Sequence, residues 1–272
     1  MKISVEKNSI FKTLSHVQSI VEKNNSIPVL NNLLIEAKNN SLTLSATDMD
    51  ISITESLNCS VIEEGSVSVA AHTLYDIIRK IPEGNEIEFI SSDGKMFTIR
   101  SGKSRFSLGC LPKEDFPIIE FDNLNSELSI EASFLLKLIE KTRFAISNED
   151  TRYFLNGIYF HKRNDGENEC LSMVATDGHR LAKIDFNLGS NPVDIPGVII
   201  PKKTIHELCK LLSDYKGTVK INLDPNKIIF FIDKSILISK LIDGTFPDYQ
   251  KVIPTNNKNI LKVQRNALGY AV

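Results

Sequence analysis

The 272-residue chain lacks the features that mark several large protein classes. No apolar run approaches the roughly 20 residues that a membrane-spanning helix requires. Residues 1–6 lack the long apolar core of a signal peptide and are typical of a first β-strand. The four cysteines lie far apart and form no Cys-x-x-Cys pair, which favours reduced thiols over a disulfide framework or a zinc site. We therefore expect a cytoplasmic protein that needs no metal and no cofactor.

Motifs for catalysis and nucleotide binding are also missing. No Gly-x-Gly-x-x-Gly, His-Glu-x-x-His or Gly-x-Ser-x-Gly occurs, and the five histidines are scattered along the chain. Residues 197–204 resemble a phosphate-binding P-loop, but Lys202 stands where the second glycine belongs and Pro201 removes a backbone donor. The formal net charge of −2 gives no sign of a nucleic-acid partner.

The most distinctive stretch is residues 174–182, Val-Ala-Thr-Asp-Gly-His-Arg-Leu-Ala, between two runs of alternating apolar residues. This pattern predicts a β-hairpin in which Gly178 supplies the positive φ of the turn. Asp177 and His179 could form part of a catalytic set, which would make the chain a hydrolase. However, no motif supplies a nucleophile, and the corresponding Asp48 is followed by Met49 and Asp50. A side-chain-braced Asx turn is therefore the favoured interpretation.

The second half of the chain repeats the first. Ala46-Thr47-Asp48 returns 129 residues later as Ala175-Thr176-Asp177, and Phe116-Pro117 returns 130 residues later as Phe246-Pro247. Each half also contains two helical patterns, each following a strand pattern: Ser9–Lys23 and His72–Lys80, then Ser133–Phe144 and Lys202–Leu212. A period of about 125–130 residues is the size of a duplicated domain.

The last residues begin the same pattern a third time. Val263–Leu268 aligns with Val5–Ile10, at about twice the repeat distance, although so short a match can also be coincidence. A strand with half a helix cannot bury its own apolar face. We expect domains at residues 1–122 and 127–255, the start of a truncated third domain at 259–272, and a parent protein of roughly 380 residues.

Charge is sorted between the helical patterns and the rest of the chain. The four helical patterns together carry +6, so the remainder of the chain carries −8. In the helix at 133–144, Lys137 and Lys141 lie opposite the face of Leu135, Leu138 and Ile139. A single lysine-bearing helix face is usually only solvated. Basic helices in both repeats instead favour one surface that meets the phosphates of DNA without reading bases.

Five segments, in order, resemble one known family: residues 27–34, 100–106, 152–157, 175–182 and 240–249. That family is the beta subunit of bacterial DNA polymerase III, the replicative sliding clamp. The resemblance implies an α+β fold of tandem clamp domains, each with helices on one face of antiparallel sheets. It further implies a non-enzymatic processivity factor whose two chains close head to tail into a ring around double-stranded DNA, without sequence specificity.

The resemblance also implies a hydrophobic groove between the second and third domains. Short peptide motifs of the polymerase III alpha subunit, the clamp loader and other clamp-binding proteins would bind there. The residues carried over to this groove are Leu155, Thr176, Gly178, His179, Arg180, Leu181, Pro247 and Val252. Because the third domain supplies part of the groove and of the dimer interface, we expect a homodimer at full length and a monomer for this chain.

DNA contacts are carried over with some departures from the family pattern. Asn24 stands where family members can carry an arginine, and a basic position at the second helix is His72. The expected DNA-facing residues are Lys23, Asn24, Arg79, Lys80, Lys137, Lys141, Arg152, Tyr153, Lys202, Lys203 and Lys210. Two alternatives remain: a hydrolase that uses Asp177 and His179, and a duplicated DNA-binding module without a peptide groove.

Overall fold

The computed structural model describes residues 1–23, 25–92, 94–117, 126–165, 168–187, 195–223 and 225–271. The first half opens with strand β1 (Lys2–Glu6) and helix α1 (Lys7–Val17). The elements that follow are η1 (Pro28–Asn31), β2 (Asn32–Lys38), β3 (Ser41–Thr47), β4 (Ile51–Asn58), β5 (Ser60–Glu63), β6 (Gly65–Ala70), α2 (Ala71–Lys80), β7 (Glu86–Ile90), β8 (Met96–Ser101), β9 (Ser104–Leu111) and η2 (Lys113–Asp115).

The second half opens in the same way, with β10 (Ser126–Glu131) and α3 (Ala132–Glu140). The elements that follow are η3 (Arg143–Ala145), η4 (Asp150–Leu155), β11 (Gly157–Asp165), β12 (Asn168–Thr176), β13 (Leu181–Phe186), β14 (Val198–Pro201), α4 (Lys202–Ser213), β15 (Thr218–Leu223), β16 (Lys227–Ile232), β17 (Ser235–Lys240), η5 (Tyr249–Val252) and α5 (Arg265–Ala271). The order of strands and helices thus recurs, as the sequence repeat predicts.

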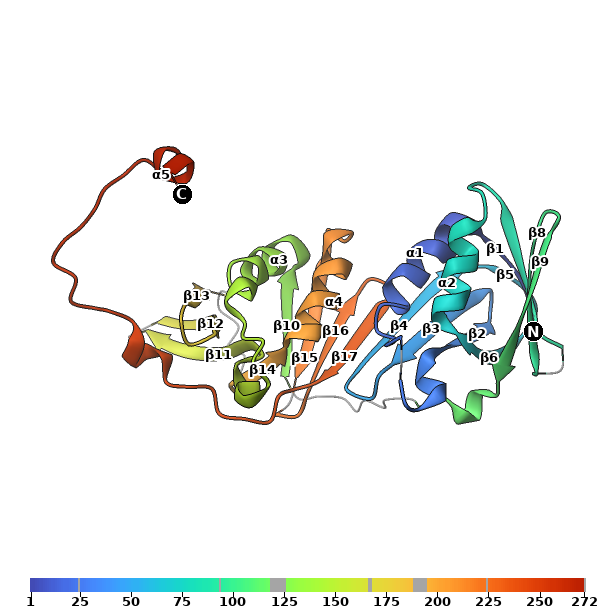
Figure 1. Ribbon diagram of the computed structural model, residues 1–272, viewed down its shortest axis with the longest axis horizontal. Helices are drawn as coiled ribbons and strands as arrows, with labels where there is room; N and C mark the ends of the chain where they lie inside the picture. Colours follow the sequence, from blue (N-terminus) through green and yellow to red (C-terminus); the bar gives the residue numbers. More distant parts are fainter. Residues whose placement is uncertain are drawn as a thin grey trace.

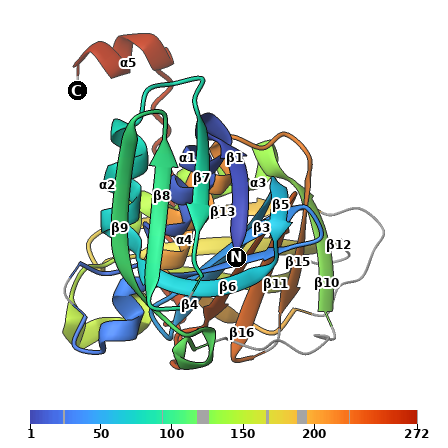
Figure 2. The same ribbon diagram turned by 90° about the vertical axis from the view of Figure 1, so that its right-hand side faces the viewer.

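Antiparallel sheets join the two halves. Thirteen strands form one sheet in the order β10-β15-β16-β17-β4-β3-β2-β6-β9-β8-β7-β1-β5, and a second sheet has the order β13-β12-β11-β14. The halves meet where β17 pairs with β4, from Ser235 opposite Glu55 to Ser239 opposite Ile51. Figure 2 looks onto the end of the molecule where β9, β8, β7 and β1 lie side by side.

All four long helices lie in a row on one side of the sheets (Figure 1). Their apolar faces are buried against the strands: Leu135, Leu138 and Ile139 of α3 are at most 1% exposed, whereas Lys137 is exposed. A continuous apolar core extends from Ile3 to Leu237 through both halves. The predicted α+β fold with helices on one face of antiparallel sheets is confirmed.

Two helices are shorter than their sequence patterns predict. Helix α1 ends at Val17 rather than Lys23, and α3 ends at Glu140 rather than Phe144. After α1, backbone bonds tighten to the three-residue spacing, and the Ser19 hydroxyl donates to the carbonyl of His16 at 2.7 Å. After α3, the buried Thr142 hydroxyl donates to the carbonyls of Leu138 and Ile139. These hydroxyls compete for the carbonyls that a continuing helix would use.

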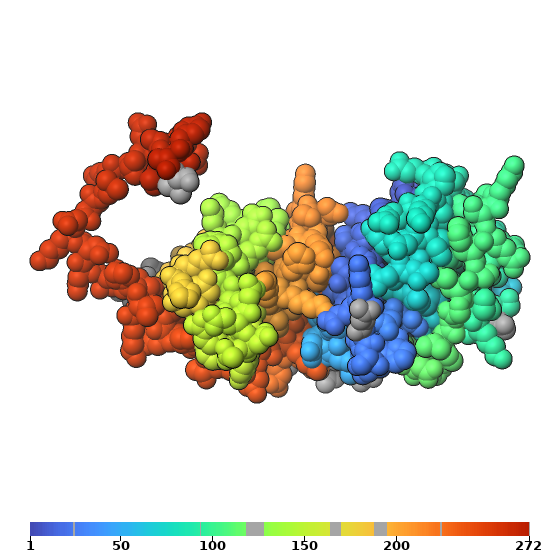
Figure 3. Space-filling model, in the orientation of Figure 1, coloured from blue at the N-terminus to red at the C-terminus, as the bar shows by residue number. Residues whose placement is uncertain are grey.

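The C-terminal arm, residues 254–271, is exposed along its whole length. Figure 3 shows it standing clear of the body. Helix α5 lies where the third copy of the pattern predicts a helix, but the described residues between β17 and α5 contain no strand. Its assignment to a third domain therefore stays a prediction. Within the described residues, none of the helices is long and apolar enough to span a membrane.

Candidate functional site

The turn between β12 and β13 is braced by the side chains of Thr176 and Asp177. The Thr176 hydroxyl donates to the carbonyl of Arg180 at 2.8 Å and accepts from the Gly178 N–H at 3.1 Å. Asp177 Oδ1 accepts from the backbone N–H groups of His179 and Arg180, both at 3.0 Å. Gly178 has a φ of 88°, as predicted for this turn. The hairpin and the Asx-type turn are both confirmed.

The same bonds argue against a catalytic use of Asp177. The backbone donors at positions 180 and 179 lower the pKa of Asp177 to about 2, and the Arg180 guanidinium also donates to its Oδ2 at 3.0 Å. A carboxylate with so low a pKa is a weak base at neutral pH. The P-loop-like stretch has no loop, because β14 ends at Pro201 and α4 begins at Lys202. The hydrolase interpretation therefore has no geometric support in either segment.

All eight residues predicted for the peptide groove line one cavity of about 550 Å³. They come from three places: the end of η4, the β12–β13 turn, and the segment after β17. We call this last segment, residues 241–253, the strap. The cavity is also lined by Arg152, Phe154, Asp248 and Tyr249, which the prediction of the groove did not include. Tyr249 is the last residue of the family-like segment 240–249, and this position in the segment could have identified it as a groove residue.

The cavity has a buried apolar floor and an exposed rim. Leu155 and Tyr249 are only 3% and 4% exposed and pack in one apolar cluster with Val174 and Phe246. Leu181 packs against the same cluster, whereas Val252 on the rim is 67% exposed. This arrangement suits an apolar ligand side chain that enters from solvent and ends against a preformed floor.

Charged side chains surround the mouth of the cavity. Arg152 Nε donates to Glu149 at 2.9 Å, and a Cβ atom at Gly178 would lie 2.6 Å from Arg152 Nη1. The guanidinium of Arg152 packs on the turn glycine at the cavity, and its predicted contact with DNA stays a prediction. Arg180, held by Asp177, lies over the ring of Phe144 at 5.8 Å. The bond to Arg152 lowers the pKa of Glu149, so both partners of this pair are charged at neutral pH.

The other cations of the predicted DNA-facing set fall into two groups. Within the described part of the chain no ion pair is made by Lys23, Lys80, Lys137 and Lys141, all of which are exposed. The remaining ones are engaged: Arg79 with Asp76, Lys210 with the buried Glu207, Lys202 with Asn148, and Lys203 with Glu22 and Asp48. Tyr153 is 53% exposed beside Phe154, and Asn24 lies outside the described residues.

Two family models cover most of the chain. Residues 1–120 match the N-terminal domain of the DNA polymerase III beta subunit, and residues 129–248 match its central domain. The chain belongs to the beta sliding clamp family. Beta sliding clamps are DNA polymerase processivity factors.

Curated relatives and solved structures agree with this assignment. The beta sliding clamp of Caulobacter vibrioides is 43% identical over 273 residues, which is 100% of this chain and 73% of the relative. The Caulobacter crescentus polymerase III beta structure has a TM-score of 0.93 at 43% identity, covering 100% of this chain and 74% of that one. The sliding clamp of Bartonella birtlesii, solved bound to griselimycin, has a TM-score of 0.90 at 45% identity, covering 95% of this chain and 69% of that one.

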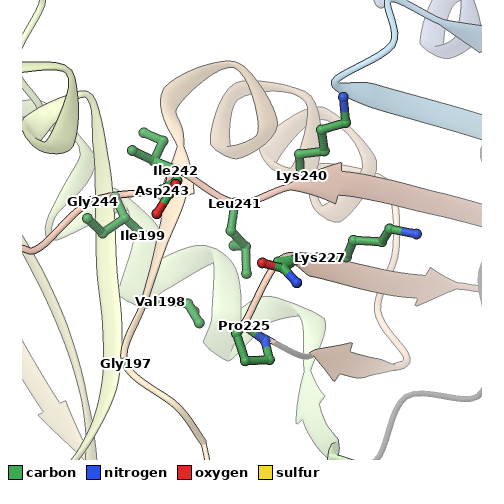
Figure 4. Close-up of a pocket in the computed structure, with 11 residues that line it drawn as sticks. Gly197, Val198, Ile199, Pro225, Lys227, Lys240, Leu241, Ile242, Asp243 and Gly244 are labelled. Atoms are coloured by element: carbon green, nitrogen blue, oxygen red, sulfur yellow. The ribbon is translucent and has the colours of Figure 1, made fainter.

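A second cavity of the clamp chain lies beside the start of the strap. Its volume is about 340 Å³, and it is bounded by β14, the β15–β16 turn and residues 240–244. In Figure 4 Leu241 and Pro225 face the hollow, while the ends of Lys227 and Lys240 point away from it. Lys240 Nζ is bonded to Asp50 Oδ1 at 3.1 Å. Since the ends of both lysines are turned away from it, this cavity offers a ligand fewer cationic partners than the groove does.

Proposed function

We propose that this clamp chain, as part of a closed homodimeric ring at full length, encircles duplex DNA and tethers the replicative polymerase and other partners through the cavity beside the strap. The observation that carries the proposal is the convergence of eight residues from three separated segments around one apolar cavity. None of the four cysteines, all of which lie in the described residues, forms a disulfide, which fits work in the cytoplasm.

The chemistry of the cavity supports a short peptide as its occupant. The floor of Leu155 and Tyr249 accepts the side chain of a leucine or phenylalanine, each worth about 1.5–3 kcal/mol when fully buried. Exposed His179 and Arg180 at the mouth can donate to backbone or carboxamide oxygens of the same peptide. A ligand with two apolar anchors and one polar end would satisfy both parts.

The helix side of the chain supports non-specific DNA binding. Four exposed lysines on this side have no acidic partner within the described residues and can contact phosphates: Lys23, Lys80, Lys137 and Lys141. Such contacts re-form at every register along the duplex, which is what a sliding ring requires. The peptide cavity favours this function over a DNA-binding module that lacks a partner groove.

A combined binding and turnover measurement tests the proposal. A labelled peptide of the Gln-Leu-x-Leu-Phe type is titrated against the chain and its His179→Ala variant by fluorescence polarisation. Saturable binding that weakens in the variant, with peptide left intact by mass spectrometry, supports the clamp. Peptide cleavage that disappears in His179→Ala would instead support the hydrolase interpretation.

A further inference from the structure

One wall of the groove is formed by the strap, whose buried residues are Phe246 and Tyr249. Pro247, Asp248, Tyr249 and Val252 all line the cavity from the strap side. Tyr249 is the last buried residue of the strap, and residues 254–271 beyond it are all exposed. The contacts that hold Tyr249 in place therefore help to set the position of this wall.

Tyr249 is held by a histidine of the neighbouring sheet. Its hydroxyl lies 3.0 Å from Nε2 of His161 on β11, a side chain that no step of the proposed function uses. His161 stacks on Tyr159 with ring centroids 4.4 Å apart, and Tyr159 stacks on Phe246 of the strap at 4.8 Å. Tyr159 and His161 are two residues apart on one strand and so share a face. Together they tie both aromatic residues of the strap to β11.

The tautomer of His161 follows from its other contact. Nδ1 lies 2.8 Å from the carbonyl oxygen of Lys162, which can only accept a hydrogen bond. Nδ1 therefore carries the proton, and Nε2 of the neutral ring accepts the hydroxyl of Tyr249. Burial lowers the pKa of His161, which keeps the ring neutral at physiological pH. His161 thus offers one acceptor to one donor.

In the first repeat, the strand position that corresponds to His161 also anchors the segment that follows the last strand. Asn32 of β2 pairs with Ala70 as Gly157 of β11 pairs with Pro201, so Glu36 occupies the position that corresponds to His161. Glu36 forms an ion pair with Lys113, which lies in η2 shortly before Phe116. In both repeats this position anchors the segment that follows the last strand, by an ion pair in one and a hydroxyl–imidazole bond in the other.

We propose that His161 is a positioning residue of the peptide groove: its Nε2 fixes Tyr249 and thereby the strap wall that Pro247 and Val252 present to the peptide. This inference rests on the proposed peptide-binding function. It assigns a role to a side chain that does not line the cavity and that contacts no ligand itself.

A pair of conservative substitutions separates hydrogen bonding from packing. The carboxamide of His161→Gln reaches the place of Nε2 and keeps an acceptor for Tyr249, whereas the shorter His161→Asn reaches only the place of Nδ1. Tyr249→Phe removes the donor and keeps the ring. Each variant, and the double variant His161→Asn/Tyr249→Phe, is tested for binding of the labelled Gln-Leu-x-Leu-Phe-type peptide. Amide hydrogen exchange of residues 246–253 is measured separately without peptide.

We expect His161→Asn and Tyr249→Phe each to weaken peptide binding about 5–10-fold, the effect of one lost hydrogen bond. Both should speed exchange in the strap, and His161→Gln should stay within about two-fold of the parent chain. The double variant should bind the peptide no more weakly than the single variant with the lower affinity, because both substitutions remove the same hydrogen bond.

Equal losses in His161→Gln and His161→Asn, or additive losses in the double variant, would overturn the proposal in favour of simple packing. Unchanged strap exchange in His161→Asn would overturn it as well. Failure of the parent chain to bind peptide would count against the proposed function instead. In that case the exchange data still decide whether His161 holds the strap.

Discussion

Thr47 and Thr176 close the same turn in the two repeats. Each hydroxyl donates to the carbonyl four residues on, at 3.0 Å to Ile51 and 2.8 Å to Arg180, and each accepts the N–H two residues on. The following aspartates brace both turns with the same backbone bonds. The first turn lies at the junction with the second half, where Lys203 bonds Asp48. The second turn lies at the groove.

The two turns differ at the residue with positive φ, which is Met49 at 80° in the first and Gly178 at 88° in the second. Replacing Gly178 with alanine should destabilise the chain by about 1–2 kcal/mol, the cost of this conformation for a residue with a Cβ. It should also displace Arg152, whose Nη1 lies 2.6 Å from the Cβ position. Met49→Gly is the matched control and should stabilise by about 0.5–1 kcal/mol. Urea unfolding measures both, and equal effects of the same sign would contradict this account.

Asp177→Asn should lower stability in a pH-dependent way. The pKa of Asp177 falls from 3.8 to about 2 in the fold, so its charged form stabilises the native state. This contribution is complete above the unfolded-state pKa and is lost as the pH falls through the folded-state value. The stability difference between parent and variant should therefore be constant above about pH 5 and shrink as the pH falls toward the folded-state pKa of about 2. A difference that grows on acidification would show that another group dominates.

Lys137 should contribute mainly to DNA binding, whereas Lys203 should contribute mainly to folding stability. Lys137→Ala should weaken DNA binding at low salt and reduce the slope of log affinity against log salt by about 1, with stability unchanged within about 0.5 kcal/mol. Lys203→Ala removes bonds to Glu22 and Asp48 across the junction and should cost up to about 1 kcal/mol of stability. Salt-dependent DNA titrations and thermal unfolding of both variants measure this. The same profile for both would refute the division into free and engaged lysines.

Substitutions in the floor and in the rim of the groove should differ in their effect on folding stability, although both should weaken peptide binding. Leu155→Ala deletes a buried side chain and should cost about 2–4 kcal/mol of folding stability in addition to peptide affinity. Val252→Ala, at a position 67% exposed, should leave stability within about 0.5 kcal/mol and still weaken peptide binding. Denaturant unfolding paired with peptide titration distinguishes them. A stable Leu155→Ala variant would mean that the floor can collapse to fill the cavity.

Much of the architecture could be predicted because the repeat and the alternating patterns are strong local signals. The first strand, predicted within residues 1–6, is β1 (Lys2–Glu6), and the hairpin predicted around Gly178 is formed by β12 and β13. Helix ends were less predictable, since serine and threonine hydroxyls at Ser19 and Thr142 end the helical geometry inside periodic patterns. The pairing of β17 with β4 joins the halves over a long sequence distance, which no local pattern encodes.

The groove residues were predicted from the resemblance, whereas the contacts of Arg152 and Lys203 could not be predicted from any local pattern. Arg152 lies in η4, where an irregular backbone with a φ of −115° and ψ of 51° turns its side chain toward Gly178. Lys203 was counted among cations for DNA, but its partners Glu22 and Asp48 are far away in sequence. His161 and Tyr249 are likewise far apart in sequence, so no local pattern predicts the hydrogen bond between them.

The most direct test of the peptide groove is a map of where the peptide binds. Amide chemical shifts of the isotope-labelled chain are followed while an unlabelled Gln-Leu-x-Leu-Phe-type peptide is added. The account predicts perturbed amides at residues 152–155, 176–181 and 248–252, with the helix side unaffected. Perturbations centred on residues 197–199 and 240–244 would move the site to the second cavity, and perturbations confined to α3 and α4 would contradict the assignment of the groove.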